Sequence, residues 1–169
     1  MHRLKLLILL AIAACTAPAP PQQGFRKPGT QLYSNAVFQP ERLQGRWDQV
    51  AAFAAPAAPA CRPGGAEFTP GALALTLCLN GRQVAASGPL VVTGPGRLAL
   101  RGADPAGIGQ PLWVLWVDDG YRTLVIGTPS GDFGFILNRG GPLPPDRLQA
   151  AREILDWNGY DLTRLRQPG

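Results

Sequence analysis

Turn-forming dipeptides recur so closely along the middle of this chain that only short strands fit between them. Turn signals recur every 8 to 12 residues, and helical periodicity is absent before residue 145. Asn-Gly at 80 and Asp-Gly at 119 are dipeptides that two-residue hairpins favour, so most consecutive strands are expected to be antiparallel neighbours. The segments between the turns predict strands at Arg46–Phe53, Gly65–Thr69, Ala72–Leu79, Gln83–Thr93, Arg97–Arg101, Leu112–Asp118, Tyr121–Thr128 and Asp132–Arg139.

A sheet of eight such strands has a simple way to protect its edges. An up-and-down sheet of this size can close on itself, and the interior then has room for side chains or one small ligand. After the last strand, Leu148, Ala151, Ile154 and Leu155 recur at helical spacing, and Gly159 ends the run. The predicted fold class is therefore all-β, an eight-stranded up-and-down antiparallel β-barrel with one C-terminal α-helix packed outside.

The N-terminus has the layout of a secretory leader. Arg3 and Lys5 form a basic region before the apolar run Leu6–Ala14, which is too short for the ~20 residues that cross a bilayer. The leader ends in Ile-Ala-Ala-Cys, which resembles a bacterial lipobox and implies a lipid on Cys15. Several acyl chains would make a durable membrane anchor. The alternative is an ordinary secretory leader with a chance cysteine.

The segment after Cys15 predicts a linker and a location. Position 16 is Thr and not the Asp of the usual inner-membrane retention signal, so we expect an outer-membrane protein on the periplasmic face. From Thr16 to about Gln31 the chain is mainly Pro, Ala, Gln and Gly, which is typical of a flexible tether. The predicted organisation is a signal peptide over residues 1–14, a lipidated cysteine and tether over 15–31, and one barrel domain over 32–169.

The two remaining cysteines predict a disulfide. Cys61 and Cys78 would lie in an oxidising compartment, where disulfides persist. Their midpoint falls within Thr-Pro-Gly-Ala at 69–72, so a tight hairpin there would bring them opposite one another across two strands. Such a bond is worth about 3 kcal/mol for a loop of this length. The alternative is a pair of unlinked buried thiols.

Three stretches of the sequence resemble the lipocalin family, in its bacterial, lipid-anchored branch. "RLQGRWDQVAAF" (42–53) resembles the first block, in which Gly-x-Trp opens the first strand. "WVLWVDDGYRTLVIGTPSGDFGFILNR" (113–139) resembles the second and third blocks, and "AREILDWNGYDLTRL" (151–165) resembles the tail. The resemblance covers residues 39–52 and 112–166 well and 53–111 hardly at all.

The resemblance implies a structural motif at the closed end of the barrel. Gly45 would let the backbone bend inward without a Cβ clash, and Trp47 would plug that end. Arg139, at the end of the last strand, would lie across the indole face in a cation–π contact worth about 0.5–2 kcal/mol.

Alternation along the strands suggests which side chains line the interior. If Arg139 points inward, so do the residues two, four and six positions before it. On the strand at 112–118, either Trp113 and Leu115 or Val114 and Trp116 face inward, and alternation leaves both open. The alternative is that these side chains simply fill a small barrel. The candidates for lining a ligand site are Phe133, Phe135, Leu137, Trp113, Trp116 and Leu115.

Several function classes are poorly supported. The net charge of +5 falls to about +3 without Arg3 and Lys5, and the arginines are scattered, so nucleic-acid binding is not expected. His2, the single histidine, lies in the leader, which argues against His-based catalysis or an imidazole metal site. Asp118 and Asp119 read as a turn and not as a carboxylate pair. We expect no catalytic residues, no metal and no cofactor.

Two functions remain open. The leading hypothesis is a membrane-anchored periplasmic protein that binds a hydrophobic small molecule, such as a fatty acid or lysophospholipid, for storage, transfer or repair. The alternative is a non-catalytic interaction or inhibitor module with a packed, ligand-free barrel, which would use loops such as 102–110. The expected partners are the hydrophobic molecule and the membrane, and a weak homodimer is left open.

Overall fold

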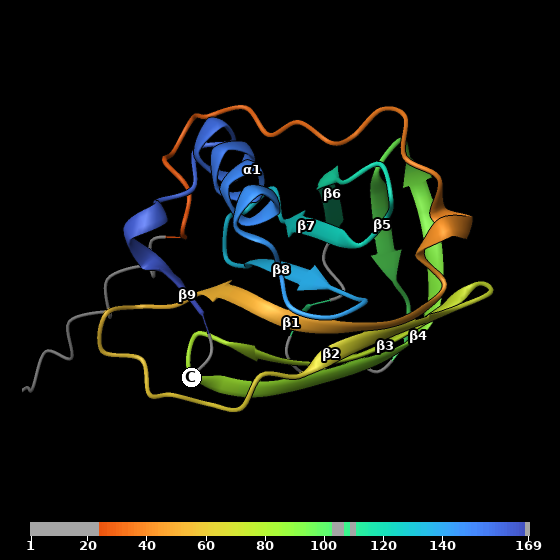
Figure 1. The fold of residues 1–169 in the computed structure, drawn as a ribbon, viewed down its shortest axis with the longest axis horizontal. Coiled ribbons are helices and arrows are strands. Elements are labelled where there is room, and N and C mark those ends of the chain that lie inside the picture. The colour runs from red at the N-terminus through yellow and green to blue at the C-terminus, as the bar shows by residue number, and fades with distance from the viewer. Residues whose placement is uncertain (1–23, 103–106, 109–110, 168–169) are drawn as a thin grey trace, which may run out of the picture.

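The chain folds into a closed β-barrel with one helix against its outer wall, which confirms the predicted fold class (Figure 1). The computed structural model describes residues 24–102, 107–108 and 111–167. The predicted signal peptide, Cys15 and the tether up to residue 23 lie outside the described residues. Among the described residues, no helix is both long and apolar enough to cross a membrane.

Each barrel strand pairs with the next in antiparallel fashion, and the first strand closes the barrel by pairing with both the second and the eighth. No end of a predicted strand differs from the observed one by more than two residues. The elements are β1 (Gly45–Phe53), β2 (Gly65–Thr69), β3 (Ala72–Leu79), β4 (Arg82–Gly94), β5 (Arg97–Leu100), β6 (Leu112–Val117), β7 (Thr123–Gly127), β8 (Gly134–Asn138), α1 (Pro145–Trp157) and β9 (Leu165–Arg166), with short 3-10 helices at Pro40–Leu43 and Leu162–Arg164.

The barrel has two distinct ends. The base is the end that carries Trp47, Tyr121 and Arg139. The mouth is the opposite end, where the connections 54–64, 80–81 and 128–133 lie. β9 was not expected from the sequence; it adds a short strand to the mouth end of β1, with Arg166 opposite Ala52.

Apolar side chains form one cluster inside the barrel and another between its wall and α1. The inner cluster includes Phe68, Leu75, Leu98 and Phe135, all buried. The outer cluster joins the buried Ala151 and Leu155 of α1 to side chains on the outer faces of β1, β6, β7 and β8. Strand alternation and the helical apolar stripe thus produce the two layers that the sequence pattern predicts.

Tyr160 fixes the segment after α1 against the wall near the mouth. Its hydroxyl donates to the Phe133 carbonyl at 2.8 Å and accepts from the Thr128 N–H at 2.9 Å. Burial raises the pKa of Tyr160 to about 12, so the hydroxyl stays a neutral donor at ordinary pH. Tyr160 lies against Gly127 and Gly134: an added Cβ would come within 2.6 Å of its hydroxyl at Gly127 and within 2.7 Å of its ring at Gly134.

Residues 24–31, which the sequence analysis placed in the tether, pack on the barrel. Phe25 is buried against Phe53, with ring centroids 5.6 Å apart. Arg26 forms a β-bridge with Tyr160 and donates to the carbonyls of Thr30 and Asn158 at 2.7 and 2.9 Å. The segment, orange in Figure 1, continues past α1 towards the base. The buried ring of Phe25 and the hydrogen bonds of Arg26 thus hold this segment against the barrel, although its composition is typical of a tether.

The disulfide between Cys61 and Cys78 is present, with Cα atoms 5.7 Å apart. The hairpin turn at Pro70–Gly71 is also as predicted, since Thr69 pairs with Ala72 and Gly71 has the positive φ that a type II turn needs. The bond is not cross-strand, however, because β2 begins only at Gly65 and Cys61 lies in the connection before it. It therefore ties the 54–64 connection to β3.

Removing this disulfide should lower the free energy of unfolding by about 3 kcal/mol, because the reduced chain regains loop entropy when it unfolds. The change is the double variant Cys61→Ser/Cys78→Ser, and the measurement is urea unfolding followed by circular dichroism. Wild-type protein under a thiol reductant should show the same loss. Unchanged stability in both samples would contradict this prediction.

Candidate ligand-binding site

The base is closed by Trp47, whose side chain is fully buried. Its indole Nε1–H donates to the Leu43 carbonyl at 2.7 Å, which gives the buried donor a partner. The guanidinium carbon of Arg139 lies 4.2 Å from the ring centroid, so the contact expected from the resemblance is present. The indole plugs this end of the barrel.

Arg139 also binds the backbone around the base. Its guanidinium donates to the carbonyls of Tyr121, Gln44 and Arg42 at 2.7, 2.7 and 2.9 Å. These bonds join the β6–β7 turn to the segment before β1, so Arg139 ties three parts of the chain together. Burial lowers the pKa of Arg139, and the nearby carboxylate of Asp118 opposes that shift.

Gly45 is required at the base for a different reason from the one inferred from the sequence. An added Cβ would meet only the Arg139 guanidinium, at an ordinary contact distance of 3.8 Å. The φ of Gly45 is instead +103°, a conformation that side-chain-bearing residues rarely adopt. Backbone conformation, and not a steric clash, therefore selects glycine here.

Asp118 organises the turn beside the base. Its carboxylate accepts the backbone N–H groups of Arg122 and Thr123 and the side chain of Arg122. Burial would raise the pKa of Asp118, but these hydrogen bonds and the charge of Arg147 outweigh it, so the pKa lies below its ordinary value. The carboxylate is thus fully used in holding the turn, as the turn interpretation of the Asp-Asp-Gly sequence predicts.

The interior of the barrel is filled by side chains. The cavity that remains between Phe68, Leu75, Leu98 and Phe135 has a volume of about 10 Å³. That is roughly the space one water molecule needs. The interior of the barrel therefore matches the alternative given in the sequence analysis, in which these side chains fill a small barrel.

Only part of the predicted lining faces the interior. Phe135 and Leu137 belong to the inner cluster, and Phe133 packs against it. The other three predicted residues are on the outer side of the wall, and the expectation for them was wrong. Trp113 and Leu115 point outward because alternation places Leu112 and Val114 inward. Trp116 points outward because of a β-bulge in β6, where the register with β7 shifts between positions 114 and 116 and breaks the alternation. Leu112, Val114 and Val117 face inward, and Trp113, Leu115 and Trp116 pack in the outer cluster.

A cleft of about 200 Å³ opens at the mouth. The buried Ala52 and Phe53 of β1 lie along it, and the β3–β4 turn, Arg166 of β9 and the following Gln167 complete it. The connection after β1 supplies the largest share of the lining. The lining residues are Gln49, Ala52, Phe53, Ala54, Ala55, Pro56, Ala58, Pro59, Ala60, Cys61, Cys78, Asn80, Gly81, Arg166 and Gln167.

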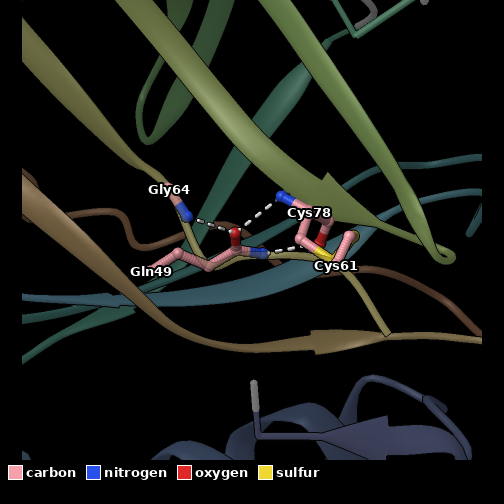
Figure 2. The surroundings of a disulfide bond; sticks show 4 residues. All are labelled: Gln49, Cys61, Gly64 and Cys78. Carbon is pink, nitrogen blue, oxygen red and sulfur yellow. Dashed lines mark hydrogen bonds between the residues drawn. A yellow bond between two sulfur atoms is a disulfide. The ribbon is translucent and has the colours of Figure 1, made fainter. Parts of the chain in front are cut away.

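Gln49 closes the barrel wall beside this cleft (Figure 2). β2 begins only at Gly65, so β1 and β3 have no strand between them closer to the mouth. The Gln49 amide spans the gap: its Nε2 donates to the Cys78 carbonyl at 2.7 Å, and its Oε1 accepts the Cys78 N–H at 2.7 Å. The same oxygen accepts the Gly64 N–H at 3.2 Å. A side-chain amide thus takes the place of a backbone peptide in the sheet.

Sequence reasoning did not identify Gln49, the 54–61 segment or Arg166. One available signal was the connection over residues 54–64, which is longer than most connections between paired strands. Loops of that length are often functional.

A larger hollow, of about 850 Å³, lies on the outer face of β1 to β4. Exposed Arg46, Asp48 and Glu67 border it, together with small side chains of β3 and β4. This hollow is open and bordered by charged side chains, so it does not enclose a hydrophobic small molecule. Within the described ranges, no group of three or more His, Cys, Asp or Glu side chains is placed to hold a metal ion.

The comparisons with known proteins agree with this fold. A family model described as a lipocalin-like domain matches residues 98–169. The solved structure of lobster apocrustacyanin A1 is similar over 75% of this chain and 77% of that chain, with 18% identity and a TM-score of 0.51. Insecticyanin from the tobacco hornworm Manduca sexta is similar over 86% of each chain, with 13% identity and a TM-score of 0.56. Identities this low show a shared lipocalin fold and nothing finer. Among curated proteins, no sequence matches.

Proposed function

We propose that this protein is a lipoprotein of the outer membrane, anchored through Cys15 on the periplasmic face, that binds a fatty acid or lysophospholipid at the mouth of its barrel for storage, transfer or repair. The observation that carries the proposal is the cleft of about 200 Å³, whose lining is mostly alanine, proline and other apolar side chains. The lipocalin fold supports it, because barrels of this size are suited to one small ligand.

The volumes favour the mouth over the interior as the binding site. Pockets that enclose a whole ligand usually measure roughly 300–1,000 Å³. The interior offers about 10 Å³ and the cleft about 200 Å³. The cleft would therefore enclose one segment of an acyl chain, and binding should be weaker than in a deep calyx.

The path of the chain supports a position near the membrane. Gly24 lies at the mouth, where the Phe25 N–H donates to the Gly131 carbonyl at 2.6 Å. Gly24 is nine positions after Cys15, and a fully extended chain over nine residue steps spans at most about 32 Å. A lipid on Cys15 would hold the cleft within that distance of the bilayer surface.

The proposal is binding and not catalysis. The histidine of the chain lies in the leader, and Asp118, the buried carboxylate, is bound to backbone N–H groups of its own turn. The side chains around the cleft include no pairing of a nucleophile with a base.

We expect dodecanoate to displace a fluorescent fatty acid from delipidated protein lacking the leader, in the micromolar range. Ala58→Trp, which fills the cleft, should abolish this displacement because a lining position becomes occupied by an indole. Ala57→Trp is the matched control, because Ala57 is the exposed neighbour of Ala58 in the chain and does not line the cleft. Absence of displacement from folded wild-type protein would contradict the proposal.

The filled interior favours a second candidate, a packed-barrel interaction or inhibitor module. The open hollow on the outer face of β1 to β4, with its border of charged side chains, would then be the contact surface, whereas most of the 102–110 loop lies outside the described residues. Crosslinking pull-downs from envelope extracts test this with the charge-reversal variant Arg46→Glu/Glu67→Lys. Capture of one partner that this variant loses, together with absence of lipid binding, would favour the second candidate.

A further inference from the structure

We propose that the mouth cleft selects single-chain amphiphiles that carry an anionic head group, and that Arg166 binds that head group. This inference rests on the proposed function, because it assigns the ligand class of the same cleft. It is carried by the charges around the cleft and by the unused hydrogen-bond donors of Arg166.

The rim of the cleft carries positive charge and no acidic side chain. Arg166 is the one charged residue among those that line it. The chain segments that build the cleft, 54–64, 78–83 and 162–167, contain arginines but neither Asp nor Glu. Arg62 and Arg82 are exposed and directly follow the lining residues Cys61 and Gly81. An anion at the rim would therefore meet attraction from more than one side.

Arg166 is held in place by its backbone while much of its guanidinium remains available. β9 pairs it with Ala52, and its Nη1 donates to the Thr163 carbonyl at 2.6 Å and to the Leu165 carbonyl at 3.5 Å. Among the described residues, Nε and Nη2 have no hydrogen-bond acceptor, and no carboxylate forms an ion pair with this side chain. Two adjacent N–H donors match the geometry of a carboxylate or phosphate.

The neighbouring charges are already engaged. The Asp161 carboxylate accepts the N–H and hydroxyl of Thr163, at 3.0 and 2.6 Å. The Arg164 guanidinium carbon lies 4.3 Å from the ring centroid of Phe25, and its Nη1 donates to the Gly24 carbonyl at 3.4 Å. The Nε of Arg164 has no hydrogen-bond partner, but it is buried. Arg166 is thus the arginine of this segment whose unused donors are exposed to a ligand.

The apolar and charged parts of the site are arranged as an amphiphile requires. An acyl segment would lie against Ala52, Phe53 and the alanines and prolines of 54–60, and the head group would remain at the solvent-facing rim beside Arg166. A neutral head group would leave the unused donors in water and gain nothing from them. The site should therefore discriminate by head-group charge.

The test compares dodecanoate, dodecyl phosphate and dodecanol as competitors of a fluorescent fatty acid. Wild-type protein should bind the anionic probes about tenfold more tightly than dodecanol, the gain expected from charge-assisted hydrogen bonds at an exposed site. The ratio of the two anionic affinities shows whether a carboxylate or a phosphate head group is preferred. Arg166→Gln should remove the preference by weakening the binding of both anionic probes about tenfold more than that of dodecanol, whereas Arg166→Lys should retain most of the preference.

Arg46→Gln is the control, because Arg46 is an exposed arginine on the outer face and lines no part of the cleft. It should keep the full preference for anions. Equal binding of all three probes to wild-type protein would overturn the role of Arg166 and leave the proposed function standing. Binding of none of them would overturn both. A preference that Arg46→Gln reduces as much as Arg166→Gln does would show long-range attraction only, and would overturn the assignment to Arg166.

Discussion

Trp47→Ala should lower the free energy of unfolding by about 4 kcal/mol. The indole is fully buried, and its removal leaves a cavity at the base that the surrounding strands cannot fill. The substitution also leaves the Leu43 carbonyl without its donor and removes the ring beneath the Arg139 guanidinium. Urea unfolding followed by far-UV circular dichroism measures the loss independently of tryptophan fluorescence.

Trp157→Ala provides the matched comparison for this substitution. Trp157 is 64% exposed and stacks on Tyr33 with ring centroids 4.8 Å apart, so its loss should cost about 0.5 kcal/mol. Trp47→Phe should fall between the two, because it keeps a ring in the base but loses the indole donor. If Trp47→Ala were as stable as Trp157→Ala, the indole would not be what closes the base.

The order and limits of the barrel strands were predictable because local chemistry determines them. Asn-Gly at 80–81 has positive φ at both residues, and Gly71 has positive φ after Pro70. These conformations depend on the residues in the turn itself, so a reader of the sequence needs no tertiary information to place them. The Trp47–Arg139 contact was predicted in another way. It came from the resemblance to the lipocalin family, in which Gly-x-Trp opens the first strand and an arginine ends the last.

The direction in which side chains point was less predictable, because it depends on pairing between strands. Alternation holds only while each residue opposes one partner. The shift between Gln49 and Ala51 in β1 and that between Val114 and Trp116 in β6 each add a residue to one strand. No feature of either sequence marks the extra residue. Of the two choices offered for residues 113–116, the second was therefore right for Val114 and wrong for Trp116.

The filled interior was also beyond the reach of the sequence. The sequence pattern around an inward-facing Phe135 or Leu75 is the same whether the side chain lines a cavity or contacts a side chain from the opposite wall. Alternation shows the direction of a side chain but not the distance between the walls of the barrel. The mouth cleft depends on a connection of low complexity whose position is set by a disulfide and a buried glutamine. Such a loop acquires its shape from tertiary contacts, which local patterns do not encode.

Gln49→Leu should lower the free energy of unfolding by about 4 kcal/mol, although leucine has nearly the same size and is more apolar. The Gln49 side chain is 4% exposed and pairs the N–H and carbonyl of Cys78 and the N–H of Gly64. Leucine would leave these three backbone groups without a partner in the wall of the barrel, at a cost of roughly 1–3 kcal/mol for each group that water does not reach. Urea unfolding by circular dichroism measures the change.

Gln83→Leu is the control for Gln49→Leu, because Gln83 is exposed on β4 directly opposite Cys78 and should change stability by no more than about 0.5 kcal/mol. Combination with Cys61→Ser/Cys78→Ser tests the mechanism further. The disulfide and the glutamine both hold residues 61–64 against β3, so their losses should not be additive. Strictly additive losses, or a Gln49→Leu protein as stable as wild type, would mean that the wall between β1 and β3 is closed without the side-chain amide. The disulfide and the packing of β2 would then have to hold this seam by themselves.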